Sequence, residues 1–417
     1  MSTGTALSDN RESALVVSLI GGSHFVNHMY LMLLPPAFAL LGPAFSVSTT
    51  QLGLAVGVLG GVVTLFQLPF GYVSDTYSRT LVLGISLGFG AVGAALAAIA
   101  QSYEWLLVSQ VVLGIGVAGH HPAHYPILAA ATDESRRGRA YSIHGFTGVL
   151  GLAAPFALVP LVLSLGGGWR EAFLTIAAFG GLYAVVCLGA FWRYVSRDVT
   201  HPPKTQATGS TPNFANELKT LLTTPLILLL TVLWFVNSLA AWGIRTYSQT
   251  LLSAGYGFAS ADASLASSAM LAVGAGFILL GGWLSDRALA EYVLYAGYGA
   301  LTVLAAVLAS SMVPVLLALG FVLLLESTID VSRPARAKLT DRASARKDVG
   351  KNFALMTIGI SAGGAIGPPV FGYVIDIAGV DVAFYLIAAL AALAIGLTAA
   401  IRAASSQPAP TTSPATE

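Results

Sequence analysis

The stretch Gly119-His120-His121-Pro122-Ala123-His124-Tyr125-Pro126 lies inside an apolar segment that runs from about Trp105 to Thr132. Three imidazoles in five residues are unusual there, because a membrane helix accepts ionisable groups mainly where they face a protein interior or a wet cavity. His120 and His124 are four residues apart and share one helix face, with His121 beside them. An earlier apolar segment carries a second pair at the same spacing, His24 and His28. The pattern predicts that these side chains line a cavity.

The composition is that of a polytopic membrane protein. The chain of 417 residues is 56% hydrophobic and only 9% charged, whereas soluble domains carry about 25% charged residues. Its mean hydropathy is +0.78. The apolar runs are continuous over about 20 residues, which fits membrane-spanning helices and excludes the alternating pattern of barrel strands. The net charge of +1 indicates no nucleic-acid partner, and the single Cys187 excludes an internal disulfide.

Apolar runs divide the chain into twelve candidate spans. We expect a cytoplasmic tail at 1–12, a six-helix bundle at 13–195, a cytoplasmic linker at 196–222, a second six-helix bundle at 223–402 and a disordered tail at 403–417. The linker and the last tail are predicted from their Ser, Thr, Gly and Pro content. The spans are expected at 13–42, 48–74, 80–100, 104–132, 140–165, 169–194, 223–252, 260–285, 290–310, 312–335, 350–376 and 381–402.

Basic residues predict the orientation of these spans, because cytoplasmic loops carry an excess of Lys and Arg. With the N-terminus inside, the outer loops hold only Arg170. We therefore expect both termini in the cytoplasm and a multi-pass protein of the cytoplasmic (inner) membrane. The basic residues assigned to the inner loops are Arg79, Arg136, Arg137, Arg139, Arg193, Arg197, Lys204, Lys219, Arg287, Arg336, Lys338, Arg342, Arg346, Lys347 and Lys351.

Short motifs of the first half recur in the second half at an offset of about 210 residues. Four matches in order, at nearly one offset, indicate two homologous six-helix halves, which would place a substrate at the midplane between them. The matches are Phe25-Val26-Asn27 with Phe235-Val236-Asn237, Gly71 to Asp75 with Gly282 to Asp286, Pro126 with Pro334, and Pro155 with Pro368.

The first inner loop carries Gly71, Asp75 and Arg79 at four-residue spacing. This pattern resembles the loop 2–3 signature of the major facilitator superfamily, although Thr76 and Ser78 replace its usual Arg and Gly. The resemblance implies an inner gate that latches the two halves, and charges at helix ends can pair across a closing interface. The alternative is a plain basic loop. A second copy of the gate signature is Gly282, Asp286 and Arg287.

Small residues recur every three or four positions in the fifth and eleventh spans, and each run ends in proline. Such spacing lets helices pack backbone to backbone in lipid. Facilitator exporters have a similar fifth helix, and the resemblance implies that it lies at the interface of the halves. The alternative is ordinary tight packing. The predicted interface residues are Gly148, Gly151, Pro155, Gly363, Gly367 and Pro368.

Two further stretches are similar to the fosmidomycin-resistance branch of drug exporters within that superfamily. They are Ser23-His24-x-x-Asn27 in the first span and His121-Pro122 in the fourth, the latter followed by the basic loop and Tyr141-Ser142-Ile143. The chain departs from that branch at His28, where an acid usually follows the Asn. It departs again near Gln110, where the drug-exporter Arg would align.

Spans 1, 4, 7 and 10 line the cavity in this superfamily, so the resemblance implies which buried polar residues face it. Glu326 is the predicted coupling carboxylate, whereas Asp330 is expected to form a structural ion pair with Arg333. Arg245 either attracts an anionic substrate or extends outward to the lipid headgroups. His144 is expected to bond the backbone near the inner rim. The predicted cavity residues are His24, Asn27, His28, His120, His121, His124, Asn237, Arg245, Glu326 and Asp330.

Several interpretations of the histidines remain open at this stage. One or two imidazoles titrate during transport, since histidine changes charge near neutral pH. Alternatively, His24, His28, His120, His121 and His124 hold Zn²⁺, Cu²⁺ or Ni²⁺, which imidazole nitrogen suits. A third interpretation is a membrane di-iron enzyme, which needs about eight ligands near the surface. In a fourth, several imidazoles only bond carbonyls freed by Pro122 and Pro126.

The sequence thus predicts a secondary active transporter that works by alternating access. We expect proton-coupled efflux of a small organic compound, drug-like or anionic, by antiport. The expected partners are this substrate, protons and the lipid bilayer, and the protein is expected to act as a monomer. No cofactor and no enzymatic activity are expected. The alternatives are transition-metal transport through the histidine cluster and the di-iron enzyme.

Overall fold

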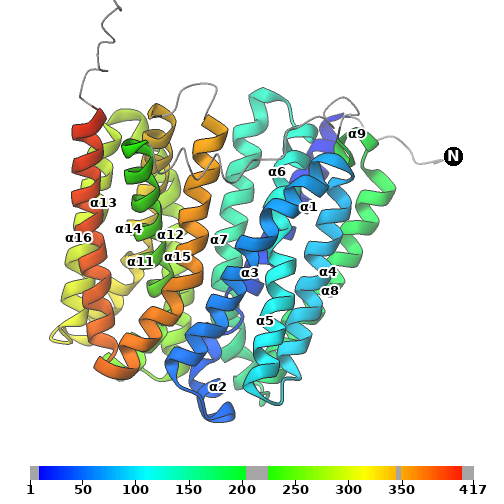
Figure 1. The fold of residues 1–417 in the computed structure, drawn as a ribbon. Helices are drawn as coiled ribbons and strands as arrows, with labels where there is room; N and C mark the ends of the chain where they lie inside the picture. The colour runs from blue at the N-terminus through cyan, green and yellow to red at the C-terminus, as the bar shows by residue number, and fades with distance from the viewer. Residues whose placement is uncertain (1–8, 203–223, 344–348, 406–417) are drawn as a thin grey trace, which may run out of the picture.

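The computed structural model describes residues 9–202, 224–343 and 349–405, which fold almost entirely into helices (Figure 1). Within these residues, 12 helical spans are long and apolar enough to cross a membrane. The prediction of twelve spans is therefore confirmed. The predicted linker from residue 203 onward and the predicted tail from residue 406 onward lie outside the described residues.

The first six spans are built from eight helices. The first span combines α1 (Asp9–Leu31), a short 3-10 turn (Pro35–Ala37) and α2 (Phe38–Phe45). The fourth combines α5 (Tyr103–Ala118) and α6 (His120–Ala131). The remaining spans are α3 (Thr49–Thr76), α4 (Arg79–Ala98), α7 (Glu134–Ser164) and α8 (Trp169–Tyr194), and the short helix α9 (Arg197–Thr200) follows them.

The last six spans follow the same order. The seventh span, α11 (Pro225–Thr250), ends in a wide turn at Leu251–Gly255. The others are α12 (Ser260–Arg287), α13 (Ala290–Ala309), α14 (Val315–Arg342), α15 (Val349–Ala378) and α16 (Val380–Ser405). The described chain starts and ends at the same face of the molecule, where α1 begins and α16 finishes (Figure 1).

Helix boundaries follow local capping chemistry. The Ser48 hydroxyl accepts a bond from the Gln51 backbone N–H, and the Gln51 side chain accepts one from the Ser48 N–H. This capping box satisfies two of the free donors at the start of α3. Ser78 and Ser102 cap α4 and α5 in the same way, each accepting from the backbone N–H three residues on. These caps set the turns that separate the spans.

The observed spans differ from the predicted ones in several places. The first helix begins at Asp9, inside the predicted polar tail, and the first span breaks at Pro35 and Pro36, which lack backbone donors. The fourth span breaks at Gly119, where a Cβ would meet atoms of α4 at 3.2 Å. The tenth span continues to Arg342, because the basic residues expected in a loop extend the helix instead.

The two halves meet along two seams, α3 against α15 and α7 against α12. In each seam the second span of one half packs on the fifth span of the other, as expected for halves related by pseudo-twofold symmetry. The α3 seam is a glycine face. A Cβ on Gly53, Gly57 or Gly60 would collide with the backbone of α15 at Pro368, Ala365 or Gly364. The absence of side chains therefore lets these two backbones touch.

Candidate functional site

A cavity of about 700 Å³ lies between the two halves. Its walls come from α1, α3, α6 and α7 on one side and from α11, α14 and α15 on the other. The lining extends to Asp75, the last residue but one of α3, and so reaches the face where the chain starts and ends. This cavity is large enough for a small-molecule ligand.

The opposite end of the cavity is closed by hydrogen bonds across both seams. Asp376 of α15 accepts bonds from the backbone N–H of Thr49 and of Thr50, at 3.0 and 2.7 Å, and from the Thr50 hydroxyl at 2.6 Å. The carboxylate thus caps the N-terminus of α3 from the other half. In the second seam, Ser264 and Ser268 of α12 donate to carbonyls of α7 at 2.7 and 2.9 Å. The cavity is therefore sealed at one face only.

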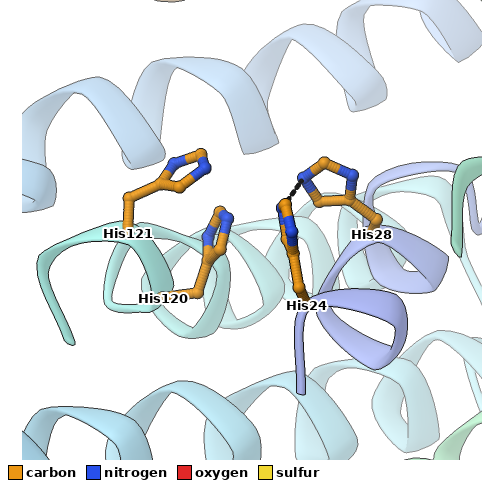
Figure 2. A group of neighbouring side chains, drawn as sticks. All are labelled: His24, His28, His120 and His121. Carbon is orange, nitrogen blue, oxygen red and sulfur yellow. Dashed lines mark hydrogen bonds between the residues drawn. The ribbon is translucent and has the colours of Figure 1, made fainter. Parts of the chain in front are cut away.

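Four imidazoles gather on the first-half wall: His24 and His28 from α1, His120 and His121 from α6 (Figure 2). We call these four residues the histidine tetrad. One nitrogen from each ring lies within 4.8 Å of the others. All four residues line the cavity. His120 and His121 are the first two residues of α6, and both face the cavity with ring centroids 3.7 Å apart.

Two further histidines, His124 and His144, lie beside the tetrad. The His144 ring stacks on His24 at 3.8 Å, and its Nε2 lies 3.1 Å from His124 Nδ1. The second nitrogen of His124 lies 2.9 Å from the Ser23 hydroxyl. Both nitrogens of His124 are thus engaged outside the tetrad. Of the five predicted metal ligands, four come together in the tetrad, and His124 lies outside it.

The second-half wall carries two ion pairs, each with a buried carboxylate. Arg245 of α11 forms an ion pair with Glu326 of α14, and both its Nε and a terminal nitrogen contact the same carboxylate oxygen. Arg333 bonds Asp330 at 2.7 Å, one turn along α14. Both carboxylates are fully buried, and each keeps one oxygen without a hydrogen-bond partner. Both arginines line the cavity.

Arg336 adds a third guanidinium to this wall. It is only 2% exposed, and it donates to Asn237 Oδ1 and to the Tyr298 hydroxyl, the latter at 3.1 Å. Its guanidinium lies 4.9 Å from the centroid of the Trp234 ring. Neither of the ion pairs among the described residues includes Arg336. The second-half wall therefore carries one guanidinium more than it has carboxylates.

The structure brings most of the predicted cavity residues to the lining. His24, His28, His120, His121, Asn237 and Arg245 line the cavity. The lining does not include Asn27, His124, Glu326 and Asp330, which lie behind it, and Asn27 bonds Ser86 at 3.3 Å. Sequence reasoning missed His144, Arg333 and Arg336 as lining residues. Arg333 and Arg336 are three residues apart and share one face of α14, but the positive-inside rule assigned Arg336 to a loop.

The predicted gate residues do not pair with each other across the halves in this conformation. Asp75 is exposed at the cavity rim, and Arg79 donates to the carbonyls of Asp198 and Val199, at 3.4 and 3.1 Å, which anchors α9. Arg287 lies over the Trp283 ring at 4.4 Å. Gly71 and Asp75 nevertheless line the cavity, so these gate residues lie at the face of the molecule to which the cavity extends.

The predicted interface glycines pack within their own halves. A Cβ on Gly148 or Gly151 would meet α1, and a Cβ on Gly363 or Gly367 would meet α11, the equivalent helix of the second half. Pro368 does reach the seam, where its carbonyl faces Gly53. The small residues of α7 and α15 thus let the cavity-lining helices α1 and α11 pack closely against them. Two backbones can approach this closely only where no Cβ lies between them.

Comparisons with known proteins agree with this architecture. The family model of the Major Facilitator Superfamily matches residues 20–330 and 329–417. The fosmidomycin resistance protein of Escherichia coli (strain K12) is 26% identical over 286 residues, which cover 68% of each chain. Protein spinster homolog 1 of Xenopus laevis is 24% identical over 249 residues, 56% of this chain and 45% of that protein.

Solved structures show the same fold. A bacterial homologue of the human lysosomal transporter Spinster, in an inward-facing and occupied conformation, superposes with a TM-score of 0.77 at 16% identity. The match covers 95% of this chain and 98% of that chain. The nucleoside transporter NupG superposes with a TM-score of 0.76 at 14% identity, over 94% of this chain and 99% of that chain.

The family model spans most of the chain, and the helices form two related halves of six spans around a cavity. The superfamily consists of transporters and not enzymes, so the di-iron enzyme is excluded. The chain therefore belongs to the Major Facilitator Superfamily and is a secondary transporter of small molecules.

Proposed function

We propose that this transporter couples the movement of a small organic anion to that of protons across the cytoplasmic membrane. The observation that carries the proposal is the excess guanidinium on the second-half wall, where Arg336 has no acidic partner among the described residues. In the low dielectric of a protein interior an unbalanced charge attracts a counter-charge far more strongly than it does in water. A carboxylate or phosphonate in the cavity would supply that counter-charge.

Glu326 is the proposed proton carrier. One of its oxygens contacts Arg245, and the other is buried without a hydrogen-bond partner. The charged groups that face it are Arg245 from α11 and Asp330 and Arg333 from α14, while α12 presents only Gly274 at this point. A proton on Glu326 would neutralise the carboxylate and release Arg245 from it. The freed guanidinium could then bind an anion in the cavity.

This arrangement predicts the sign of the coupling. An anion that binds Arg245 favours protonation of Glu326. By reciprocity, protonation of Glu326 favours binding of the anion. The two ligands then move together. Exchange, which the resemblance to drug exporters predicts, needs a substrate that competes with the proton for Glu326, such as a cation. On this arrangement, a cationic substrate would be expelled in exchange for protons, whereas an anionic substrate would move together with them.

Transport assays in proteoliposomes test both points. The purified chain is reconstituted with a pH-sensitive dye inside the vesicles, and fosmidomycin, a phosphonate named by the Escherichia coli relative, is the first probe. Simple carboxylates follow. We expect substrate flux and proton flux in the same direction and at a fixed ratio. Flux that ignores an imposed pH gradient would remove the coupling, and flux in opposite directions would favour exchange.

Glu326→Gln tests the proposed carrier, because glutamine keeps the shape and the hydrogen bond to Arg245 but cannot gain a proton. We expect it to lose gradient-driven accumulation by at least tenfold while substrate exchange at equal pH continues. Glu104→Gln is the matched control, since Glu104 is exposed at the start of α5, away from the cavity. An unchanged gradient response in Glu326→Gln would contradict the assignment.

A transition metal is the second candidate cargo. The observation that favours it is the convergence of four imidazole nitrogens on the cavity wall. The same vesicles, loaded with a metal-sensitive dye, would report Ni²⁺ or Zn²⁺ entry in place of organic flux. If His28→Gln left such entry unchanged, this candidate would fail.

A further inference from the structure

We propose that the histidine tetrad is a binding site for one divalent transition-metal ion of the Ni²⁺, Cu²⁺ and Zn²⁺ class. The claim concerns binding, whether or not the ion is carried, so it goes beyond the proposed proton-coupled transport and survives its failure. The tetrad lies on the first-half wall, opposite the ion pairs on which that transport proposal depends.

Backbone carbonyls fix the tautomers of three tetrad rings. His24 Nδ1 lies 2.6 Å from the His144 carbonyl oxygen, and His28 Nδ1 lies 2.9 Å from that of Gly148. His120 Nδ1 lies 2.8 Å from the Val117 carbonyl oxygen. A carbonyl oxygen only accepts, so each Nδ1 must carry the hydrogen. In a neutral ring the Nε2 atom then presents a bare lone pair.

These lone pairs point at one another. His24 Nε2 and His28 Nε2 are only 2.9 Å apart (Figure 2). His120 Nε2 is buried without any hydrogen-bond partner. Two facing lone pairs repel, and a buried acceptor without a donor is unfavourable because it has lost its bond to water. The structure therefore requires positive charge between these rings. A single proton can serve one pair of nitrogens, whereas a metal ion serves all four.

The contacts behind the rings have the form that metal sites use. A metal-bound histidine almost always donates its other ring N–H to a carbonyl or carboxylate, which orients the ring and fixes its tautomer. His24, His28 and His120 each have such a carbonyl. Two of these carbonyls belong to α7, which comes close enough because Gly148 and Gly151 face α1 without a Cβ.

Ligand chemistry and spacing select the ion. Imidazole nitrogen suits Zn²⁺, Cu²⁺ and Ni²⁺, and a set without oxygen ligands does not suit Mg²⁺ or Ca²⁺. With metal–nitrogen bonds of about 2.05 Å, neighbouring ligands lie about 2.9 Å apart in a square or octahedral site and about 3.3 Å apart in a tetrahedral one. The 2.9 Å separation of His24 and His28 fits this range.

Closing the site requires only a small adjustment. The widest separation of 4.8 Å must shorten by about 1–2 Å for adjacent ligand positions. His121 can supply this movement, because it is only partly buried and one face of its ring stacks on Tyr125 at the cavity wall. All four ligands are neutral, so the bound ion would keep its charge and attract an anion from the cavity.

Calorimetric titration of the full-length chain tests the site directly. The protein is purified in detergent with a histidine-free tag and stripped with a chelator, then titrated with NiCl₂, ZnCl₂ and MgCl₂. We expect one Ni²⁺ or Zn²⁺ per chain and no binding of Mg²⁺. His28→Gln and His121→Gln should each weaken Ni²⁺ binding at least tenfold. His201→Gln is the control, because His201 follows α9 and bonds Thr200, far along the chain from the tetrad.

Two results would overturn the proposal: no binding of either ion at millimolar concentration, or binding that both tetrad variants leave unchanged. Thermal unfolding of the metal-free variants shows whether they fold. Electron paramagnetic resonance of Cu²⁺ bound to the unaltered chain gives an independent answer that needs no variant. Hyperfine splitting from several imidazole nitrogens supports the tetrad, and a spectrum dominated by oxygen ligands rejects it.

Discussion

The absence of one Cβ helps to position the tetrad. Gly148 of α7 faces the ring of His24, and a Cβ there would lie 2.6 Å from Nδ1 and 2.7 Å from Nε2. Real Cβ atoms do not approach so closely, so any larger residue must displace the ring. The displaced ring would lose its bond to the His144 carbonyl and its alignment with His28. A glycine on a helix that carries none of the four ligands thus controls ligand geometry.

Gly148→Ala tests this control at the residue scale. We expect the variant to weaken Ni²⁺ binding about tenfold, as outer-shell changes at metal sites commonly do, although all four imidazoles remain. The same calorimetric titration measures it. Gly138→Ala on the same helix is the matched control, because nothing lies within 4 Å of a Cβ there. Equal Ni²⁺ affinity in both variants would show that α7 does not fix the position of the His24 ring.

Spacing in the sequence predicted part of this chemistry. The four-residue intervals placed His24 with His28 on one helix face, because side-chain direction repeats over that distance. Spacing did not predict that the rings of His120 and His121 lie 3.7 Å apart, because adjacent residues of a helix point about 100° apart. Spacing could not identify the ion-pair partner of Glu326 either, since Arg245 is 81 residues away in the chain.

At the scale of elements, the N-terminal end of α3 is held by a charge from the other half. The Asp376 carboxylate of α15 caps α3 through Thr49 and Thr50. For the cavity to open at this face, α3 and α15 must separate and the cap must break. The cap therefore favours the conformation described here over the alternative one.

Asp376→Asn should shift this balance toward opening of the sealed face. A helix N-cap contributes about 1 kcal/mol, which corresponds to about a fivefold change in the equilibrium. Distances between spin labels at Gln101 and Leu316, both exposed near that face, would show a larger long-distance population by pulsed resonance. Asp381→Asn is the control, because Asp381 accepts from Ser311 within its own half. An unchanged distance distribution in Asp376→Asn would exclude a latching role.

The elements themselves were the easiest part to predict. Lipid offers no partners to backbone groups, so a long apolar run must be a helix, and all twelve spans followed from that rule. Which face of a helix meets which neighbour was harder. Glycines of α7 and α15 were expected across the halves, yet they face α1 and α11, while Gly53, Gly57 and Gly60 of α3 form the contact between halves. Periodic small residues indicate close packing without identifying the partner.

For the whole molecule, the basic residues predict that the face with the chain ends is cytoplasmic. Single-cysteine labelling tests it, because the native Cys187 is fully buried and gives little background. In intact cells a membrane-impermeant maleimide should label Gln101→Cys, in the turn between α4 and α5. It should label Ser405→Cys, at the end of α16, only after permeabilisation. The reverse pattern would invert the molecule and with it the direction of every gate.

The two seams are alike in topology but unlike in chemistry. One is fastened by the Asp376 carboxylate and the other by the neutral hydroxyls of Ser264 and Ser268. Bonds to a charged acceptor are roughly twice as strong as neutral ones. The halves should therefore part first along the serine side, and complete opening then breaks the Asp376 bonds on the acidic side. A substrate arriving from that face would therefore meet an entrance that is wider beside α7 and α12 than beside α3 and α15.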